Sequence, residues 1–298
     1  KRAPFMLFLA HKALHPNVVQ RDDGSTGALA SSQPEGFVAA ERHRGRYASA
    51  VVPRRSNAMR APTRTPALLR PIPGLPPLSA ATGTSETDVR ARLEMLLGVD
   101  ESLARITETL RAMGQLDNTV VVFTSDHGYF YGEHGLNAER RLAYEETARI
   151  PLIVRYPPVA RAGATVPQMA QIIDLAPTVL ALASVADPTA RQGRSLVPLL
   201  EGASVPWRDS ILLEYYTDQV FPRTLTMEYQ AVRTERYKYI HYVELTGMDE
   251  LYDLQADPYE LENLIGTAPG DRVLPELQAG LAKLQQDTGY RRDFRGYR

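Results

Sequence analysis

The segment from residue 120 to residue 136, VVVFTSDHGYFYGEHGL, limits what this chain can be more than any other part of the sequence. Apolar residues that favour strands lead directly into Asp126 and His127, which place a carboxylate and an imidazole at the end of the predicted strand. An open α/β sheet collects its ligand-binding groups beyond the carboxyl ends of its strands. Both side chains are good ligands for a divalent cation, and Gly128 permits a tight backbone turn after them. The segment therefore predicts a metal site at the end of a strand.

A second interpretation of the same pair is purely structural. Aspartate followed by histidine is common, and an isolated pair more often consists of a capping carboxylate and a packed loop histidine. The position after a strand, together with the Gly-Glu-His-Gly cluster at residues 132–135, favours the metal site. Within that cluster, we expect His134 to order the loop and to carry no chemistry.

Composition excludes several classes of protein. The chain has 298 residues, 44% of them hydrophobic, which is enough for one large domain or for a domain with a smaller companion. A net charge of −1 gives no general attraction to nucleic acid or to a membrane surface, and no apolar stretch reaches the roughly 20 residues of a membrane span. We predict neither a nucleic-acid nor a membrane partner. The absence of cysteine excludes disulfides and thiolate metal sites. Because Lys1 does not look like a native N-terminus, the localisation stays open.

The first part of the sequence predicts a parallel α/β arrangement. The apolar run at residues 4–10 is typical of a central strand, and residues 17–84 form a long loop region rich in Gly, Ser, Pro and Arg. A helix is expected to begin after Ser85, which can cap it, and to be followed by a strand at 120–124. The apolar stripe of the predicted helix consists of Val89, Leu93, Leu96, Leu103, Ile106, Leu110 and Met113.

The later part changes character. A strand at 150–154 and a helix at 171–184 complete a first domain, which we predict to span residues 1–205. Residues 206–298 are expected to form a smaller α+β subdomain, an antiparallel sheet with a terminal helix. Lys238, on one of these strands, is expected to lie on an outward face and to have no role.

Several segments, read in order, resemble the landmarks of the sulfatase family within the alkaline-phosphatase-like hydrolases. They are the metal motif itself, LAHKALHP, RRLAYEETARIPLIVRYP, DLAPTVLALA, GRSLVPLLEG and ELYDLQADPYELENL. The resemblance implies a mostly parallel sheet flanked by helices, followed by the smaller C-terminal subdomain.

The resemblance also implies roles for particular residues. Asp126 and His127 would be two ligands of a divalent cation, which is usually calcium in the family, with magnesium or manganese as alternatives. His15 would contact the sulfate and protonate the leaving oxygen, and Lys12 would lie in the same pocket. The family's remaining ligands, an Asp-Asp pair, come from a strand that would precede Lys1. Asp22-Asp23 follows the His-Pro motif, and we do not assign it to that role.

Arg140 departs from the family pattern, because sulfatases usually have a lysine at this position, where it contacts a sulfate oxygen. Arginine keeps the charge and adds a planar fork that can bind an oxyanion through two hydrogen bonds. Arg141 is an equally cationic neighbour, and a shift of one residue would exchange the two. Two solvated loop arginines are the structural alternative.

The resemblance implies a sulfatase that hydrolyses the sulfate ester of a small molecule or a carbohydrate, with a formylglycine nucleophile made from cysteine. Since the chain has no cysteine for the nucleophile and lacks the family's Asp-Asp ligands, we expect it to bind metal poorly and to turn over little by itself. Two alternatives remain open: a phosphonate or phosphate ester hydrolase on the same scaffold, and a truncated, catalytically inactive relative. A homo-oligomer and a partner that carries the missing half are both compatible with the sequence.

One further feature is a run of arginines. Residues 42–70 contain eight arginines and neither Asp nor Glu. A solvated Arg- and Pro-rich loop is the preferred interpretation, and steering of a polyanionic substrate is the alternative.

Overall fold

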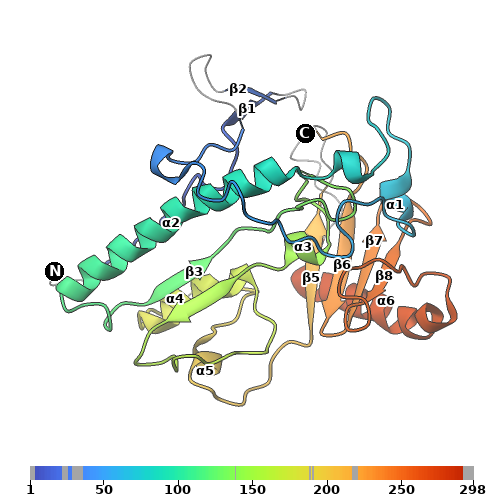
Figure 1. The fold of residues 1–298 in the computed structure, drawn as a ribbon. Helices are drawn as coiled ribbons and strands as arrows, with labels where there is room; N and C mark the ends of the chain where they lie inside the picture. The colour runs from blue at the N-terminus through green and yellow to red at the C-terminus, as the bar shows by residue number, and fades with distance from the viewer. Residues whose placement is uncertain are drawn as a thin grey trace. The chain divides into compact units, whose positions relative to one another are not determined.

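The computed structural model describes residues 4–21, 26–28, 36–137, 139–187, 189, 191–216 and 221–290 (Figure 1). The chain forms two compact units: unit 1 comprises residues 1–54 and 84–116, and unit 2 comprises residues 55–83 and 117–298. Asp22 and Asp23 lie outside the described residues. Among the described residues, no helix has the length and the apolar character needed to cross a membrane.

Unit 1 is built around the long helix α2 (Glu86–Ala112). The predicted cap is confirmed: the Ser85 hydroxyl accepts a hydrogen bond from the Asp88 amide at 3.1 Å, and Gly114, with φ of +64°, follows the helix end. The unit also contains the hairpin β1 (Val18–Gln20) and β2 (Thr26–Ala28) and the 3-10 helix η1 (Glu41–His43). The predicted helix therefore forms as the sequence indicates.

The apolar run at the start of the chain does not form the predicted strand. Residues 4–10 have no regular secondary structure, and the side chains from Phe5 to Leu9 are 49–84% exposed. A strand requires a neighbour that completes its hydrogen-bonded ladder, and none of the described strands pairs with this segment. The apolar pattern predicted a buried strand, and neither the strand nor the burial is observed, because no described strand pairs with this segment.

In unit 2 Asp126 and His127 follow β3 (Val121–Thr124), which pairs with β4 (Leu152–Arg155). The strands of this pair are antiparallel, with Thr124 opposite Leu152, a direction that the sequence did not predict for this pair. The physical reason lies in the connection. The amides of Gly128 and Tyr129 donate to carbonyls of the short helix α3 (Glu145–Ala148), which holds α3 beside the end of β3. Because β4 begins shortly after α3, it starts at this end of β3 and runs in the opposite direction.

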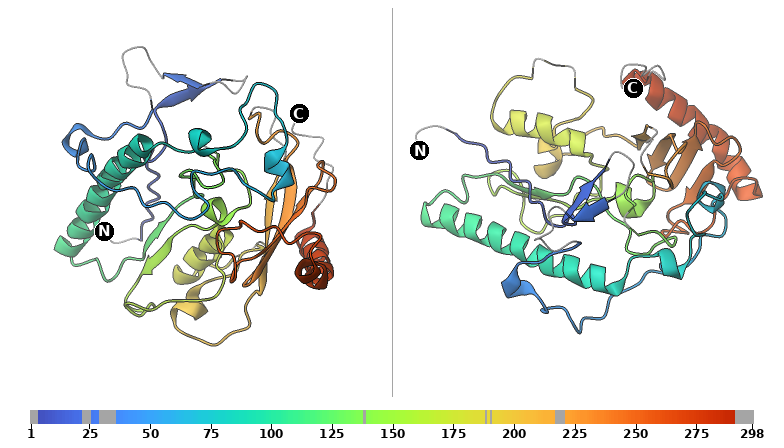
Figure 2. Two further views of the ribbon diagram at one scale, coloured as in Figure 1. Left: turned by 45° about the vertical axis from the view of Figure 1, so that its right-hand side comes forward. Right: turned by 90° about the horizontal axis from the view of Figure 1, so that it is seen from above.

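The C-terminal part contains a four-stranded antiparallel sheet in the order β5 (Ser210–Tyr215), β6 (Tyr229–Thr234), β7 (Tyr237–Tyr242) and β8 (Glu250–Asp253). The terminal helix α6 (Ala268–Thr288) packs on it, as Figures 1 and 2 show. This antiparallel sheet with its terminal helix is the arrangement that the sequence predicted for the C-terminal subdomain.

The two faces of this sheet belong to two cores. One face packs on α6, with Val232, Tyr239 and Leu251 against helix residues Leu277 and Leu281. The other face contributes Ala231, Ile240, Tyr242 and Tyr252 to a core that includes Phe130, Leu136 and Tyr144, which flank the metal motif. The sheet is therefore directly continuous with the surroundings of the candidate site.

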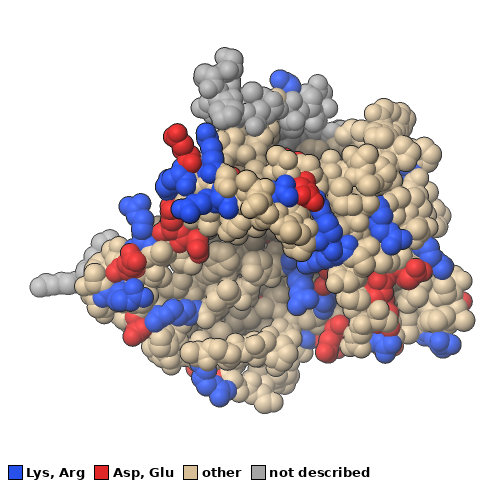
Figure 3. Space-filling view, viewed as in Figure 1, with Lys and Arg blue, Asp and Glu red and all other residues tan. Residues whose placement is uncertain are grey.

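The remaining elements of unit 2 are short. They are α1 (Pro66–Leu69), η2 (Ala80–Thr82), η3 (Ile172–Asp174), α4 (Leu175–Leu182) and α5 (Val197–Leu200). The helix predicted at 171–184 is present as η3 and α4. On the surface drawn in Figure 3, acidic and basic side chains are interspersed, in keeping with the near-zero net charge. The domain boundary after residue 205 stays a prediction.

Candidate functional site

Asp126 and His127 lie together in the loop that leaves β3. The Asp126 carboxylate accepts hydrogen bonds from the His127 amide at 3.0 Å and from the Ser125 hydroxyl at 3.3 Å. Ser125 also donates to the His127 carbonyl at 2.8 Å, which closes the loop on itself. The Asp126 side chain is 81% exposed and that of His127 is 41% exposed, so both groups can reach a ligand from solvent.

The hydrogen bonds of His127 define which nitrogen can bind a metal. Its Nδ1 lies 2.7 Å from the Gly128 carbonyl oxygen, an acceptor, so Nδ1 carries the hydrogen and Nε2 presents a lone pair. Nε2 lies 3.3 Å from Oδ2 of Asp126. Two electron-pair donors at this distance require either a proton on Nε2 or a cation beside both, and the pair therefore fits part of a divalent cation site. The described residues contain no cluster of three or more such ligands.

Gly128 has a function that the sequence did not indicate. A Cβ atom on this residue would lie 1.9 Å from the Glu146 carbonyl oxygen, a distance that no real side chain tolerates. The Gly128 amide donates to the Thr147 carbonyl at 2.9 Å, and the Tyr129 amide donates to the Glu146 carbonyl at 3.0 Å. The glycine is thus required for close contact between the metal loop and α3, more than for a turn.

The Gly-Glu-His-Gly cluster is buried and ordered. His134 is 1% exposed, has φ of +54° and stacks on Tyr144 with ring centroids 4.5 Å apart. Its amide donates to the Asn57 carbonyl at 2.9 Å. Burial, assisted by the charge of Lys238, lowers the pKa of His134 to about 4. A neutral, packed imidazole agrees with the expected structural role.

The two candidate anion-binding arginines are held differently. Glu139 accepts hydrogen bonds from the amides of Arg140 and Arg141 at 2.8 and 2.9 Å and from Nη1 of Arg141 at 3.2 Å. The Arg141 guanidinium also lies 3.3 Å above the centre of the Phe221 ring. Glu139 and Phe221 therefore hold the side chain of Arg141, Glu139 also holds the backbone of Arg140, and both residues are partly exposed.

Lys12 and His15 lie together in a turn of unit 1. The His15 amide donates to the Lys12 carbonyl at 2.8 Å, and both side chains are exposed. Lys12 donates to Asn17 at 3.3 Å, Nδ1 of His15 contacts the Pro16 carbonyl at 2.8 Å, and the buried Arg92 of α2 donates to Leu14 at 3.2 Å. Asp126, His127 and Arg140 belong to unit 2.

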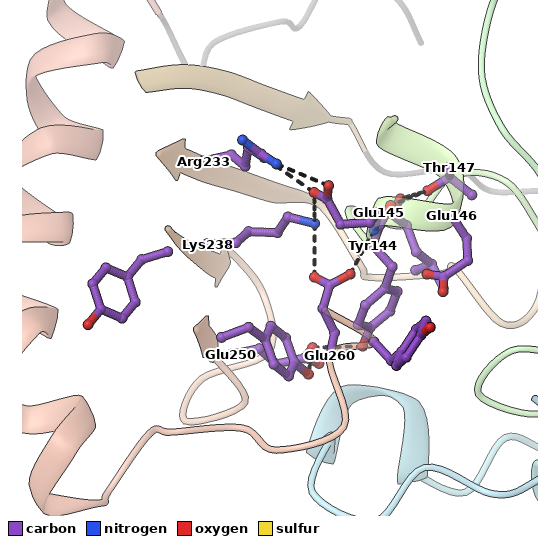
Figure 4. Close-up of polar contacts among 12 residues, drawn as sticks. Tyr144, Glu145, Glu146, Thr147, Arg233, Lys238, Glu250 and Glu260 are labelled. Carbon is purple, nitrogen blue, oxygen red and sulfur yellow. Dashed lines mark hydrogen bonds and ion pairs between the residues drawn. The ribbon is translucent and has the colours of Figure 1, made fainter. Parts of the chain in front are cut away.

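A buried ionic cluster next to α3 was missed by sequence reasoning (Figure 4). The prediction for Lys238 is wrong: its side chain is fully buried, with Nζ 2.9 Å from Glu145 and 2.8 Å from Glu260. Arg233 approaches Glu145 at 3.2 Å. Strand alternation was the available signal, because Lys238 shares a face with Ile240 and Tyr242.

The carboxylates of this region have strongly altered acidities. Burial raises the pKa of Glu145, but Lys238 and Arg233 outweigh it and lower the value to about 2. Glu260 contacts the same Lys238 ammonium, yet burial raises its pKa to about 7. Unlike Glu145, it is fully buried and is not paired with Arg233. Burial also raises the pKa of Glu250 to about 7, against hydrogen bonds from three tyrosine hydroxyls. We take the contrast between Glu145 and Glu260 as a difference in solvation.

The three tyrosines connect the sheet to the site. The hydroxyls of Tyr144 and Tyr252 donate to Oε2 of Glu250 at 2.7 Å each, and that of Tyr242 donates to Oε1 at 3.3 Å. Tyr144 immediately precedes α3 and stacks on His134. The C-terminal sheet thus contacts the start of α3 at two residues: Glu250 binds Tyr144, and Lys238 binds Glu145.

Similarity to known proteins agrees with this arrangement. The sulfatase family model matches residues 2–185, and a model described as the C-terminal part of N-sulphoglucosamine sulphohydrolase matches residues 132–287. An N-acetylglucosamine-6-O-sulfatase of Bacteroides thetaiotaomicron is 38% identical over 202 residues, which are 66% of this chain and 36% of that protein. The chain therefore spans little more than a third of the length of this relative.

Solved structures give the same result. A protein solved in complex with its substrate D-glucosamine-2-N,6-O-disulfate is 36% identical, with a TM-score of 0.61 over 67% of this chain and 41% of that one. The phosphonate monoester hydrolase of Agrobacterium radiobacter is 28% identical, with a TM-score of 0.61 over 68% of this chain and 43% of that one. These similarities confirm the predicted α/β sulfatase-like fold, and the chain belongs to the sulfatase family.

Proposed function

We propose that this chain carries the cation- and anion-binding part of a sulfatase-type hydrolase. The observation that supports the proposal most is the pair Asp126 and His127 at the end of β3, with Nε2 and Oδ2 3.3 Å apart and both side chains exposed. The substrate class we propose is a carbohydrate sulfate ester, since relatives of 38% and 36% identity are a glucosamine sulfatase and a protein that binds a sulfated glucosamine.

Each predicted residue then has a distinct task. Asp126 and His127 would hold a divalent cation, calcium in our proposal or else magnesium or manganese, and the carboxylate suits such a hard ion. When bound, this cation would neutralise the sulfate oxygens and polarise the sulfur as a Lewis acid. Arg140 and Lys12 would contact the sulfate, and His15 would donate a proton to the leaving alcohol oxygen. Nδ1 of His15 is engaged by Pro16, so Nε2 is the nitrogen that would carry this proton.

The nucleophile is a separate question. Family members use a formylglycine made from cysteine, and this sequence contains no cysteine. These 298 residues therefore do not supply that nucleophile, and we expect little turnover of sulfate esters by this chain alone. The proposal for the isolated chain is weak recognition of cation and sulfate, which does not require the nucleophile.

Hydrolysis of phosphonate esters is a second candidate. Arg140 in place of lysine supports it, because a planar guanidinium can bind two oxygens of a phosphonate. The 28% identity to a phosphonate monoester hydrolase supports it as well. The two candidates can be separated by measuring the affinities of the wild type and of Arg140→Lys for glucosamine 6-sulfate and for phenylphosphonate. The sulfatase proposal expects the wild type to bind the sulfated sugar more tightly. Preference for phenylphosphonate would support the second candidate.

Calorimetric titration with Ca²⁺ tests the cation site directly. We expect Asp126→Asn to weaken Ca²⁺ binding by at least about tenfold, since a charged ligand is replaced by a neutral one. Asp117→Asn is the matched control, because Asp117 is exposed and pairs with Arg155 outside the site. Equal affinity in the wild type and Asp126→Asn would refute the assignment of this ligand.

A further inference from the structure

The metal loop depends on α3 for its position. The two residues that follow His127 donate their amides to the carbonyls of Glu146 and Thr147, at 3.0 and 2.9 Å. The close approach of Gly128 to the Glu146 carbonyl leaves no room for a shift of one segment against the other. A displacement of α3 therefore displaces the loop that carries Asp126 and His127.

Helix α3 cannot hold this position by its own stability. It has only four residues, Glu145–Ala148, and a single helical turn is unfavourable without tertiary support. Its N-terminal cap residue, Tyr144, makes no side-chain cap, and the hydroxyl of Tyr144 donates instead to Glu250 on β8. External contacts must therefore fix the helix.

Lys238 on β7 lies at the centre of those contacts. Its Nζ pairs with Glu145 on α3 and with Glu260 in the loop after β8, and Glu260 in turn accepts the Glu145 amide at 2.7 Å. The first residue of α3 is thus held by its side chain, which Arg233 also contacts, and by its backbone, and Lys238 binds both of the carboxylates involved (Figure 4). Lys238 and Glu260 are fully buried, so water does not replace either partner.

We propose that Lys238 is a positioning residue for the cation site: it fixes α3 to the C-terminal sheet, and α3 fixes the loop of Asp126 and His127. The role assigned to the loop rests on the function proposed above. Apolar side chains of similar volume can replace a buried ionic cluster without loss of stability. Unlike apolar side chains, the ammonium and the carboxylates form directional hydrogen bonds, and these bonds fix the orientation of Glu145 relative to β7.

Amide hydrogen exchange in the full chain tests this proposal without any cation. In Lys238→Met we expect the amides of Gly128 and Tyr129 to exchange at least about tenfold faster than in the wild type, because their acceptors are no longer held. Arg236→Met is the matched control. Arg236 belongs to the same hairpin but forms an exposed ion pair with Asp253, away from α3, and this variant should leave both amides unchanged.

A triple variant separates positioning from stability. Lys238→Met leaves the buried Glu260 without its ammonium and Glu145 with Arg233 alone, and the loss of a buried counter-ion destabilises the fold as a whole. Lys238→Met combined with Glu145→Gln and Glu260→Gln removes both carboxylates together with the ammonium, and the Arg233 guanidinium, 19% exposed, then contacts a neutral amide. We expect amides of β6 and of α6 to exchange in this variant as in the wild type, while those of Gly128 and Tyr129 still exchange about tenfold faster. Unchanged exchange at Gly128 and Tyr129 in the triple variant overturns the proposal, whether or not the single variant folds.

Ca²⁺ titration of the same proteins distinguishes this proposal from the one on which it rests. We expect the triple variant to bind Ca²⁺ about tenfold more weakly than the wild type. If the wild type binds Ca²⁺ and the triple variant binds it equally well, Lys238 is not a positioning residue for the site. If the wild type does not bind Ca²⁺ although its loop is protected, the proposed cation site fails, whereas faster exchange in the variant still supports the mechanical link.

Discussion

Gly128 shows how a single residue sets the geometry of the candidate site. The absence of a Cβ atom lets the backbone reach the carbonyl of Glu146, and the adjacent amides then bond to α3. His127 shows a similar dependence, since a hydrogen bond from Nδ1 to Gly128 turns Nε2 toward Asp126. At this scale, the chemistry of the site follows from backbone contacts that lie next to it.

Gly128→Ala is expected to destabilise the protein by about 1–3 kcal/mol, the usual cost of forcing extra volume into a packed region. The free energy of unfolding from urea denaturation measures this effect. Gly98→Ala is the control: Gly98 lies inside α2 with open space around its Cβ position. This variant should gain about 0.5–1 kcal/mol, because alanine favours helix more than glycine does. A neutral Gly128→Ala variant would contradict the close contact.

At the level of elements, α2 and α3 obtain their stability in opposite ways. Helix α2 is 27 residues long and begins at a capping serine, so much of its stability is local. Helix α3 is a single turn that is held by the C-terminal sheet. The long helix could therefore be predicted from sequence and the short one could not.

The cap of α2 can be tested by Ser85→Ala. Loss of the hydrogen bond from the Asp88 amide should lower the free energy of unfolding by about 1 kcal/mol. Ser85→Thr retains the acceptor at the cap and the hydroxyl that donates to Asp88 at 2.9 Å, and should stay within about 0.5 kcal/mol of the wild type. Thermal unfolding followed by circular dichroism measures both variants, and equal losses in the two would show that the cap does not contribute.

At the scale of the whole molecule, buried carboxylates make stability depend on pH. Burial raises the pKa of Glu250 and of Glu260 to about 7 from the ordinary value of 4.5. Between pH 4.5 and about 7, the folded state therefore keeps protons that the unfolded chain has released. The free energy of unfolding must fall as pH rises through this range. Glu145, with a pKa lowered to about 2, acts in the opposite sense: it adds stability as pH rises from about 2 to 4.5.

These shifts predict that the urea midpoint is higher at pH 5 than at pH 7.5. Glu250→Gln mimics the protonated side chain, still accepts hydrogen bonds from tyrosine, and should reduce the difference between the two pH values. Glu276→Gln, on the exposed part of α6, should leave that difference unchanged. A midpoint that rises from pH 5 to pH 7.5 in the wild type would contradict the assigned directions.

Much of the fold and part of the site could be predicted from local sequence. The capped helix after Ser85, the strand that leads to Asp126 and His127, and the antiparallel C-terminal strands all depend on neighbours within a few residues. The family motifs are also short segments that can be recognised from neighbouring residues. The roles of Lys12, His15 and Arg140 stay predictions, because they depend on how separate segments face a ligand.

The sequence by itself determined the capped helix after Ser85, the strand before Asp126 and His127, and the C-terminal strands, because periodicity, capping and composition act over short distances. Only the tertiary structure decided that β4 runs antiparallel to β3, that residues 4–10 form no strand, and that Lys238 is buried between two glutamates. Each of these outcomes depends on a partner far away in the chain. Strand pairing and charge burial are set by that partner, and no local pattern encodes its identity.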